Sequence, residues 1–249
     1  MKTQPRPTES LSVDLTAVKD QLHALLYEAL ETEKGGVLVY ETALKCAIND
    51  ELIEEWEKYL RQTQTHVTVL TNVLKKIGLN PDQDTAGRNV VRHSGMSLVK
   101  TMEIALMAGK PAAAQMVAAE CVVQAETKDH MNWQLIGAAA QSAAGTLKDL
   151  LQKAYKEVED EEDEHLYHTT GWARELHLQA LGLPAQLPPV EEEKDVKSEM
   201  QAAEVRKERK QALAGQKGDR SEEKDRQEGS GVQRSSENKR KRQTGRSAA

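Results

Sequence analysis

Residues 49–81 read NDELIEEWEKYLRQTQTHVTVLTNVLKKIGLNP. Within this stretch, residues 51–77 contain neither proline nor glycine, and their apolar side chains recur every three or four positions, which is typical of an amphipathic helix. Asn49-Asp50 supplies turn residues in front of the helix, and Gly78 followed by Pro81 supplies stop signals behind it. The sequence therefore predicts one long helix between two sharp boundaries.

A helical stretch of similar length precedes this segment. Residues 11–48 contain no proline and are interrupted only by Gly35-Gly36. Because the connection between the two helices is short, we expect them to lie antiparallel as a helical hairpin. The pattern recurs further along the chain, where residues 112–140 and 146–181 are helical in character and flank a turn of small residues at 142–145. The sequence therefore predicts two antiparallel hairpins.

The segment between the hairpins has a weaker helical pattern. We expect residues 84–108 to be helical, either as one helix or as two short helices that break at Ser94-Gly95. No stretch alternates between apolar and polar residues with a period of two, so no strand is predicted. The expected fold is all-α: a four-helix bundle over residues 15–183 whose two hairpins are joined by a long, partly helical crossover.

Composition separates this body from the ends of the chain. The 249 residues are 30% charged and include no phenylalanine. Residues 184–249 carry 16 basic and 13 acidic side chains, a net charge of +3, which leaves −9 on residues 1–183. Because the C-terminal segment has few apolar residues to bury, we expect a disordered, charged tail with transient helix around residues 198–213. Residues 1–14 are expected to be flexible.

A basic cluster near the C-terminus bears on the choice of partner. Lys239, Arg240, Lys241 and Arg242 could contact an anionic surface such as nucleic acid. Acidic residues elsewhere in the same segment weaken this electrostatic footprint. A solvated tail is therefore the favoured interpretation, and a nucleic-acid arm is the alternative.

Several classes of protein are disfavoured by what the sequence lacks. No run approaches the roughly 18 apolar residues of a membrane-spanning helix, and residues 1–14 lack the apolar stretch of a secretory signal. We therefore expect a cytoplasmic protein with no membrane partner. Cys46 and Cys121 have no metal-binding spacing and are expected to be small buried hydrophobes. We find no glycine-rich phosphate loop and no nucleophile triad.

Polar residues interrupt the apolar seams of all four predicted bundle helices. A seam is the set of core-facing positions, which alternate in steps of three and four. Each seam is apolar at both ends and contains acids or imidazoles near its middle, and all three tryptophans lie on the seams. The interrupting residues are Glu33, His66, Glu126, Glu162 and His165, with His130 one turn from Glu126.

The lengths of the hairpins place these polar residues at one level. Glu33 and His66 are equally far along the chain from the first hairpin's turn, and Glu126 and Glu162 are equally far from the second. At about 1.5 Å per residue, each lies roughly 25 Å from its turn, near mid-helix. Carboxylates inside a bundle are costly unless they are paired or bind a metal ion.

The five interrupting residues form a donor set that suits a metal ion. Glu162 and His165 are three positions apart, so both project from one face of a helix. Carboxylate oxygens mixed with imidazole nitrogens favour iron or manganese, with zinc a weaker candidate. We therefore predict a metal site formed by Glu33, His66, Glu126, Glu162 and His165.

Other interpretations stay open from the residues alone. The acidic run at 157–164 is typical of a solvated helix face, and half-buried His–Glu hydrogen bonds without metal would also explain the polar positions, as would a misassigned heptad. His130 is either an additional ligand or a group behind the ligands. His23, His93 and His168 are expected to be exposed or incidental.

Several of these motifs resemble those of the ferritin-like superfamily. They are Thr32-Glu33-Lys34, the run YLRQTQTHV at residues 59–67 with Leu70, Glu126, and the Glu162-x-x-His165 pair. Within the superfamily, the chain is most similar to the YciF-type stress-associated proteins, over residues 15–181. The resemblance implies a ferritin-like four-helix bundle with a central di-metal carboxylate site, in proteins that often form homodimers.

Thr63 departs from the pattern of that superfamily. Classical members carry Glu-x-x-His on the second bundle helix as well as on the fourth, and here Thr63 occupies the glutamate position of that motif. The predicted ligands are then one carboxylate short, because three negative charges do not balance two divalent cations. An asymmetric dinuclear site, a single metal ion and a site that has lost its metal all remain open.

Two functions follow as hypotheses. In the first, an iron- or manganese-binding protein of the stress response activates dioxygen or peroxide, or sequesters iron. Glu126 is then the expected bridging ligand, and Tyr40 is a redox neighbour of the metal. In the second, a non-catalytic helical interaction protein recruits a partner through residues 184–249.

Overall fold

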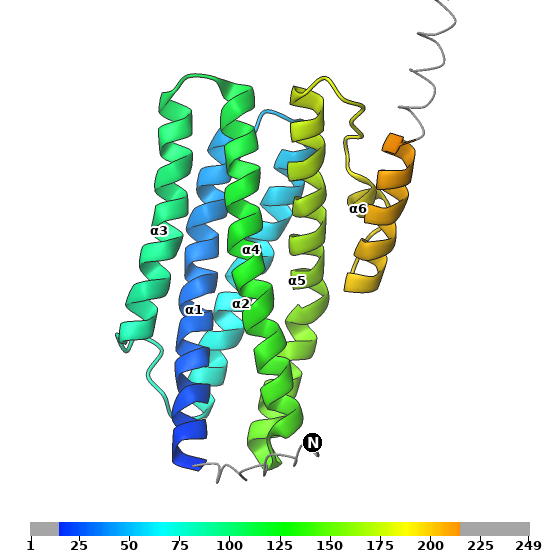
Figure 1. Ribbon diagram of the computed structural model, residues 1–249. Helices are drawn as coiled ribbons and strands as arrows, with labels where there is room; N and C mark the ends of the chain where they lie inside the picture. Colours follow the sequence, from blue (N-terminus) through cyan, green and yellow to red (C-terminus); the bar gives the residue numbers. More distant parts are fainter. Residues whose placement is uncertain (1–14, 215–249) are drawn as a thin grey trace, which may run out of the picture. The chain divides into compact units, whose positions relative to one another are not determined.

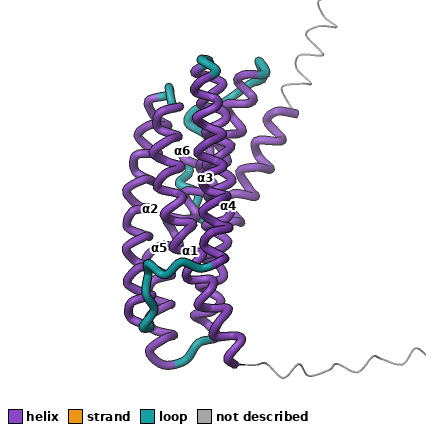
Figure 2. The backbone as a smooth tube through the Cα atoms, turned by 90° about the vertical axis from the view of Figure 1, so that its left-hand side faces the viewer, coloured by secondary structure: helices purple, strands orange, loops and turns teal. Residues whose placement is uncertain are grey.

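The computed structural model describes residues 15–214, and every regular element in that range is helical (Figures 1 and 2). The elements are α1 (Leu15–Cys46), α2 (Asp50–Lys76), α3 (Ala86–Met107), α4 (Pro111–Ser142), α5 (Gly145–Ala180) and the short α6 (Val190–Glu193). The body runs to Glu199, and residues 200–214, which are helical throughout, belong to a second unit. The predicted all-α class is confirmed for the described residues.

Two antiparallel hairpins form the body. Figure 1 shows α1 returning through α2, and α4 returning through α5. Contacts between α1 and α4 and between α2 and α5 join the two hairpins into one bundle of four helices. The fifth long helix, α3, packs against α1 and α4. The two predicted hairpins and their turns are therefore present.

Local sequence signals set the ends of the helices. The Asn49 side chain accepts a hydrogen bond from the backbone N–H of Leu52 at 2.9 Å, which caps the start of α2. At the other end Gly78 has a φ of 82°, and the N–H of Leu79 donates to the carbonyl of Leu74 at 2.9 Å. A left-handed glycine with this bond satisfies the last carbonyls of a helix. These are the boundaries that the sequence predicts.

The crossover contains one long helix. Of the two possibilities for residues 84–108, the continuous helix is present, because α3 runs through Ser94-Gly95 without a break. A Cβ on Gly95 would lie 3.6 Å from the Cα of Gly35 on α1. Glycine at this point therefore lets two helices approach closely rather than ending one of them.

The core consists of two apolar clusters with a polar level between them. One cluster contains Trp56 and Trp172, and the other contains Trp133 with Leu26 and Leu70. All three tryptophans are buried, as their seam positions predict. Along each bundle helix the residues between the two clusters are the predicted acids and imidazoles.

The end of the body lies beyond the predicted boundary. Residue 183 was expected to be the last folded residue, but Glu191 and Val196 are only 2% and 1% exposed. Arg174 on α5 donates to both carboxylate oxygens of Glu191, at 2.6 and 2.8 Å. This ion pair fixes Glu191 of α6 against α5, and residues 184–199 belong to the same unit as the bundle, although a tail was predicted from residue 184 onward. The helical run at 199–214 matches the helix expected around 198–213.

Some predictions fall outside the described residues. They are the flexibility of residues 1–14, the character of residues 215–249, and the basic cluster at Lys239, Arg240, Lys241 and Arg242. Within the described part, Cys46 and Cys121 are buried free thiols, as expected. No helix among the described residues is both long and apolar enough to cross a membrane.

Candidate metal centre

The five predicted ligands converge in the middle of the bundle. Glu33 comes from α1, His66 from α2, Glu126 from α4, and Glu162 and His165 from α5. Each is at most 3% exposed. These side chains are therefore buried at the level predicted from the hairpin turns. They do not lie on a solvent-exposed helix face, which was the alternative for the acidic run at 157–164.

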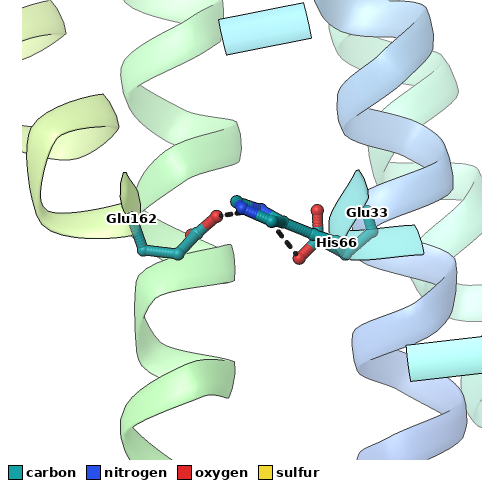
Figure 3. A group of neighbouring side chains, drawn as sticks. All are labelled: Glu33, His66 and Glu162. Carbon is teal, nitrogen blue, oxygen red and sulfur yellow. Dashed lines mark ion pairs between the residues drawn. The ribbon is translucent and has the colours of Figure 1, made fainter. Parts of the chain in front are cut away.

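The first group of donors consists of Glu33, His66 and Glu162, whose nearest ligand atoms all lie within 4.8 Å of one another. Figure 3 shows Glu162 and Glu33 reaching the His66 ring from opposite sides. His66 Nδ1 lies 2.9 Å from Glu162 Oε1 and 3.6 Å from Glu33 Oε1. One imidazole nitrogen and two carboxylates thus face a common point.

The second group consists of Glu126, Glu162 and His165, within the same 4.8 Å limit. His165 Nδ1 lies 3.5 Å from Glu126 Oε2 and 3.7 Å from Glu162 Oε1. Glu162 belongs to both groups, and the rings of His66 and His165 stack with their centroids 5.7 Å apart. The structure therefore places Glu162, rather than the expected Glu126, between the two groups.

Buried donor atoms without hydrogen-bond partners occur on all five residues. They are Glu33 Oε2, His66 Nδ1, Glu126 Oε2, both carboxylate oxygens of Glu162, and His165 Nδ1. A buried polar atom that makes no hydrogen bond costs about 1–3 kcal/mol. Their clustering at one level is what a metal site requires, because a cation satisfies all of these atoms together.

Outer hydrogen bonds orient the ligands. His66 Nε2 lies 2.8 Å from Glu161 Oε2, and His165 Nε2 lies 3.0 Å from the amide oxygen of Gln62. Because these partners are acceptors, each Nε2–H donates outward, and in the neutral imidazole Nδ1 is left with its lone pair facing the interior. Carboxylate or carbonyl support behind a histidine is the usual arrangement around metal-binding imidazoles.

Glu33 is held in a similar way. Trp133 Nε1 donates to Glu33 Oε1 at 2.7 Å, while Glu33 Oε2 has no partner. One oxygen is therefore fixed by the indole, and the other remains available to a cation.

The level carries uncompensated negative charge. Burial raises the pKa of Glu162 to about 7, and the neighbouring charge of Glu33 adds to this effect. Burial alone would lower the pKa of His66, but the carboxylates of Glu33, Glu161 and Glu162 raise it well above its ordinary value. A bound cation would relieve the repulsion between the acids and replace the proton on His66.

Asp129 is a buried acid that the sequence prediction missed. It lies on α4 three positions after Glu126, and its Oδ1 has no hydrogen-bond partner. Burial and the charges of Glu33, Glu162 and Glu126 hold its pKa well above the ordinary value. The Glu126-x-x-Asp129 spacing, which repeats that of Glu162-x-x-His165, is the signal that could have found it.

Thr63 does not contribute to the donor set. Its hydroxyl donates to the carbonyl of Tyr59 one turn back along α2, at 2.9 Å. Its methyl group lies 3.2 Å from where a Cβ of Gly36 would be. The Thr63 side chain is thus turned onto its own helix.

His130 lies outside both groups of donors. Its Nδ1 is 3.2 Å from Asp163 Oδ1, and its Nε2 is 2.8 Å from the side-chain nitrogen of Gln134. Of the two roles left open for His130, this placement favours a group behind the ligands.

His168 corrects another expectation. It was expected to be exposed or incidental, but it is buried, with Nδ1 3.0 Å from Glu55 Oε1 and 3.0 Å from the hydroxyl of Tyr59. His93 is exposed, as expected, and His23 is half-buried. Heptad counting missed His168 because it covers only the two core positions of each repeat.

Tyrosines flank the centre on the side of His165. The Tyr59 ring centroid is 4.2 Å from that of His165, and the Tyr40 centroid is 6.1 Å from it. Burial and the nearby charge of Glu126 raise the pKa of Tyr40 well above its ordinary value. Tyr40 is therefore a neutral phenol beside the donors, where the sequence placed a redox neighbour.

Comparison of the chain with protein-family models, with curated proteins and with solved structures finds no match. Evidence on function therefore comes from the geometry of the centre itself.

Proposed function

We propose that this chain is a ferritin-like metal-binding protein with a dinuclear iron or manganese centre. The observation that carries the proposal is the set of six buried donor atoms, none of them in a hydrogen bond, that face one another on Glu33, His66, Glu126, Glu162 and His165. The spacing of the sequence predicts these five residues, and their donor atoms lie at one buried level of the bundle. Oxygen-rich donor sets with two imidazoles suit iron and manganese better than zinc.

Each group of donors would hold one ion, and Glu162, which belongs to both, would bridge them. The pKa of buried Asp129 lies well above its ordinary value, so its carboxyl would supply a fourth negative charge on losing its proton to a bound cation. Four acids would then balance two divalent cations. The charge that Thr63 fails to provide on α2 is thus available from α4.

Iron or manganese bound here would supply one-electron redox chemistry toward dioxygen or peroxide, in a protein of the stress response. The chain's own residues fix the centre. Glu161 and Gln62 orient the two imidazoles, and the apolar clusters pack on either side of the centre. Whether the centre turns over a substrate or sequesters iron is decided by the rate at which Fe(II)-loaded protein consumes peroxide.

Metal analysis of protein purified without chelator tests the proposal. We expect iron or manganese to co-purify with the wild type and to be lost in Glu162→Ala, which removes the shared ligand. Glu157→Ala, at an exposed acid of the same helix, is the matched control and should retain the metal. Wild-type protein with no more metal than Glu162→Ala would refute the proposal and favour the interaction protein.

A further inference from the structure

A polar cavity borders the centre between α4 and α5. Its volume is about 120 Å³, which is room for several water molecules. Glu162 and Trp133 form part of its wall, and they are the shared ligand and the indole that holds Glu33. The cavity therefore adjoins the donor groups.

The walls of this cavity are acidic. Glu159, Glu162 and Asp163 follow the (i, i+3, i+4) spacing that places side chains on one helix face, and His130 faces them from α4. No lysine or arginine occurs among the described residues that line the cavity. Like charges on one face destabilise a helix, so this arrangement has a cost that a visiting cation would offset.

The exposure of the side chains that line the cavity falls from Asp163 and His130 toward Glu162. The side chains of Asp163 and His130 are 18% and 14% exposed, and that of Glu162 is 2% exposed. Glu162 Oε1 lies 2.9 Å from His66 Nδ1, whereas Oε2 is buried without a hydrogen-bond partner. A buried carboxylate oxygen without a partner in the wall of an acidic cavity is an observation independent of the cavity's charge, and it indicates a cationic ligand.

We infer that this cavity is a transit site that receives a divalent cation from solvent and delivers it to Glu162. Asp163 and His130, whose Oδ1 and Nδ1 lie 3.2 Å apart, would be the first protein groups to replace water on the ion. Glu159 adds negative potential, which concentrates cations. The inference rests on the proposed function and gives His130 a role distinct from that of the permanent ligands.

The rate of Co(II) uptake by metal-free, full-length protein tests the inference, with visible absorption reporting coordination. The test variant is Glu159→Gln/Asp163→Asn. The matched control is Asp149→Asn/Glu157→Gln, which removes two exposed acids of the same helix. Gln134→Lys adds a positive charge at an exposed position of the cavity wall without removing a buried group.

We expect the test variant and Gln134→Lys to bind as much Co(II) at saturation as the wild type, about tenfold more slowly. The control pair should bind at nearly the wild-type rate. Uptake slowed equally in the test and control pairs, or in neither, would overturn the transit site while leaving the metal centre standing. Wild-type protein that gives no Co(II) spectrum at all would overturn the proposed function itself.

Discussion

At the scale of single residues, the centre depends on acids buried without their usual partners. Glu162 is the clearest case, because both of its oxygens lack hydrogen bonds and it lies between two imidazoles. Such a carboxylate is costly in a protein that only needs to fold. A bound cation would offset the cost of burying this carboxylate. Replacing each buried acid in turn therefore tests whether a cation binds at this level.

Asp129→Asn tests the fourth acid. The substitution keeps the size of the side chain and removes the negative charge that Asp129 would carry once a cation displaces its proton, so we expect metal affinity to fall roughly 10- to 100-fold. Competition with a chromophoric chelator measures this change. Asp160→Asn, at an exposed acid of α5, should bind metal like the wild type. Equal affinity in Asp129→Asn and the wild type would show that three glutamates suffice.

At the scale of elements, glycines set how closely the helices approach. A Cβ on Gly137 of α4 would lie 2.7–2.9 Å from atoms of the Tyr155 ring, whereas a Cβ on Gly35 of α1 would meet Gly95 at 3.9 Å, an ordinary contact. The same substitution should therefore have opposite effects at these two positions.

Gly137→Ala should lower the free energy of unfolding by about 1–3 kcal/mol, because the methyl group must displace a ring held by its hydrogen bond to Glu159. Gly35→Ala should be neutral or raise it by up to about 1 kcal/mol through helix propensity. Urea denaturation of both variants measures the difference. Equal stability of the two would mean that α4 and α5 are not held as closely as described.

Glu31 ties α3 to α1. Its carboxylate is buried and lies 2.7 Å from Arg88 Nη2 and 2.6 Å from Arg92 Nε. Glu31→Gln leaves buried Arg88 without its counter-charge, although Arg88 keeps bonds to the carbonyls of Pro81 and Gln83. We expect a loss of roughly 2–4 kcal/mol in the free energy of unfolding at neutral pH.

That loss should depend on pH in a defined direction. Burial alone would raise the pKa of Glu31, but hydrogen bonds from Arg92 and Arg88 hold it below the ordinary 4.5. A lowered folded-state pKa stabilises the protein above 4.5, and this contribution disappears as the pH falls through the folded value. The difference between the wild type and Glu31→Gln should therefore shrink below pH 4.5. A constant difference would rule out ionised Glu31 as its source.

At the scale of the whole molecule, the sequence predicts the features that depend on local signals and on the number of residues between two positions. Residues 49–81 set the length of α2 through Asn49 and Gly78, and distances from the hairpin turns placed Glu33 level with His66. The features that were left open or missed depend on contacts between distant segments. Gly95 fails to break α3 because α1 supplies Gly35, and Glu191 is buried because α5 supplies Arg174.

The residues of the site also divide into those that the sequence predicts and those that depend on packing. The five donors lie on heptad seams, whose spacing is visible in the chain. Asp129 and His168 lie at flanking positions, and their burial depends on how the four helices are rotated about their axes. That rotation is a property of the packed bundle and not of any one segment.

If two metal ions lie between Glu33, His66, Glu126, Glu162 and His165, anomalous diffraction from crystals grown with Mn(II) will locate them. We expect two anomalous peaks about 3.5–4 Å apart, with Glu162 contacting both. Diffraction that shows no peak at this level, with the five side chains hydrogen-bonded to one another, would contradict the proposed centre.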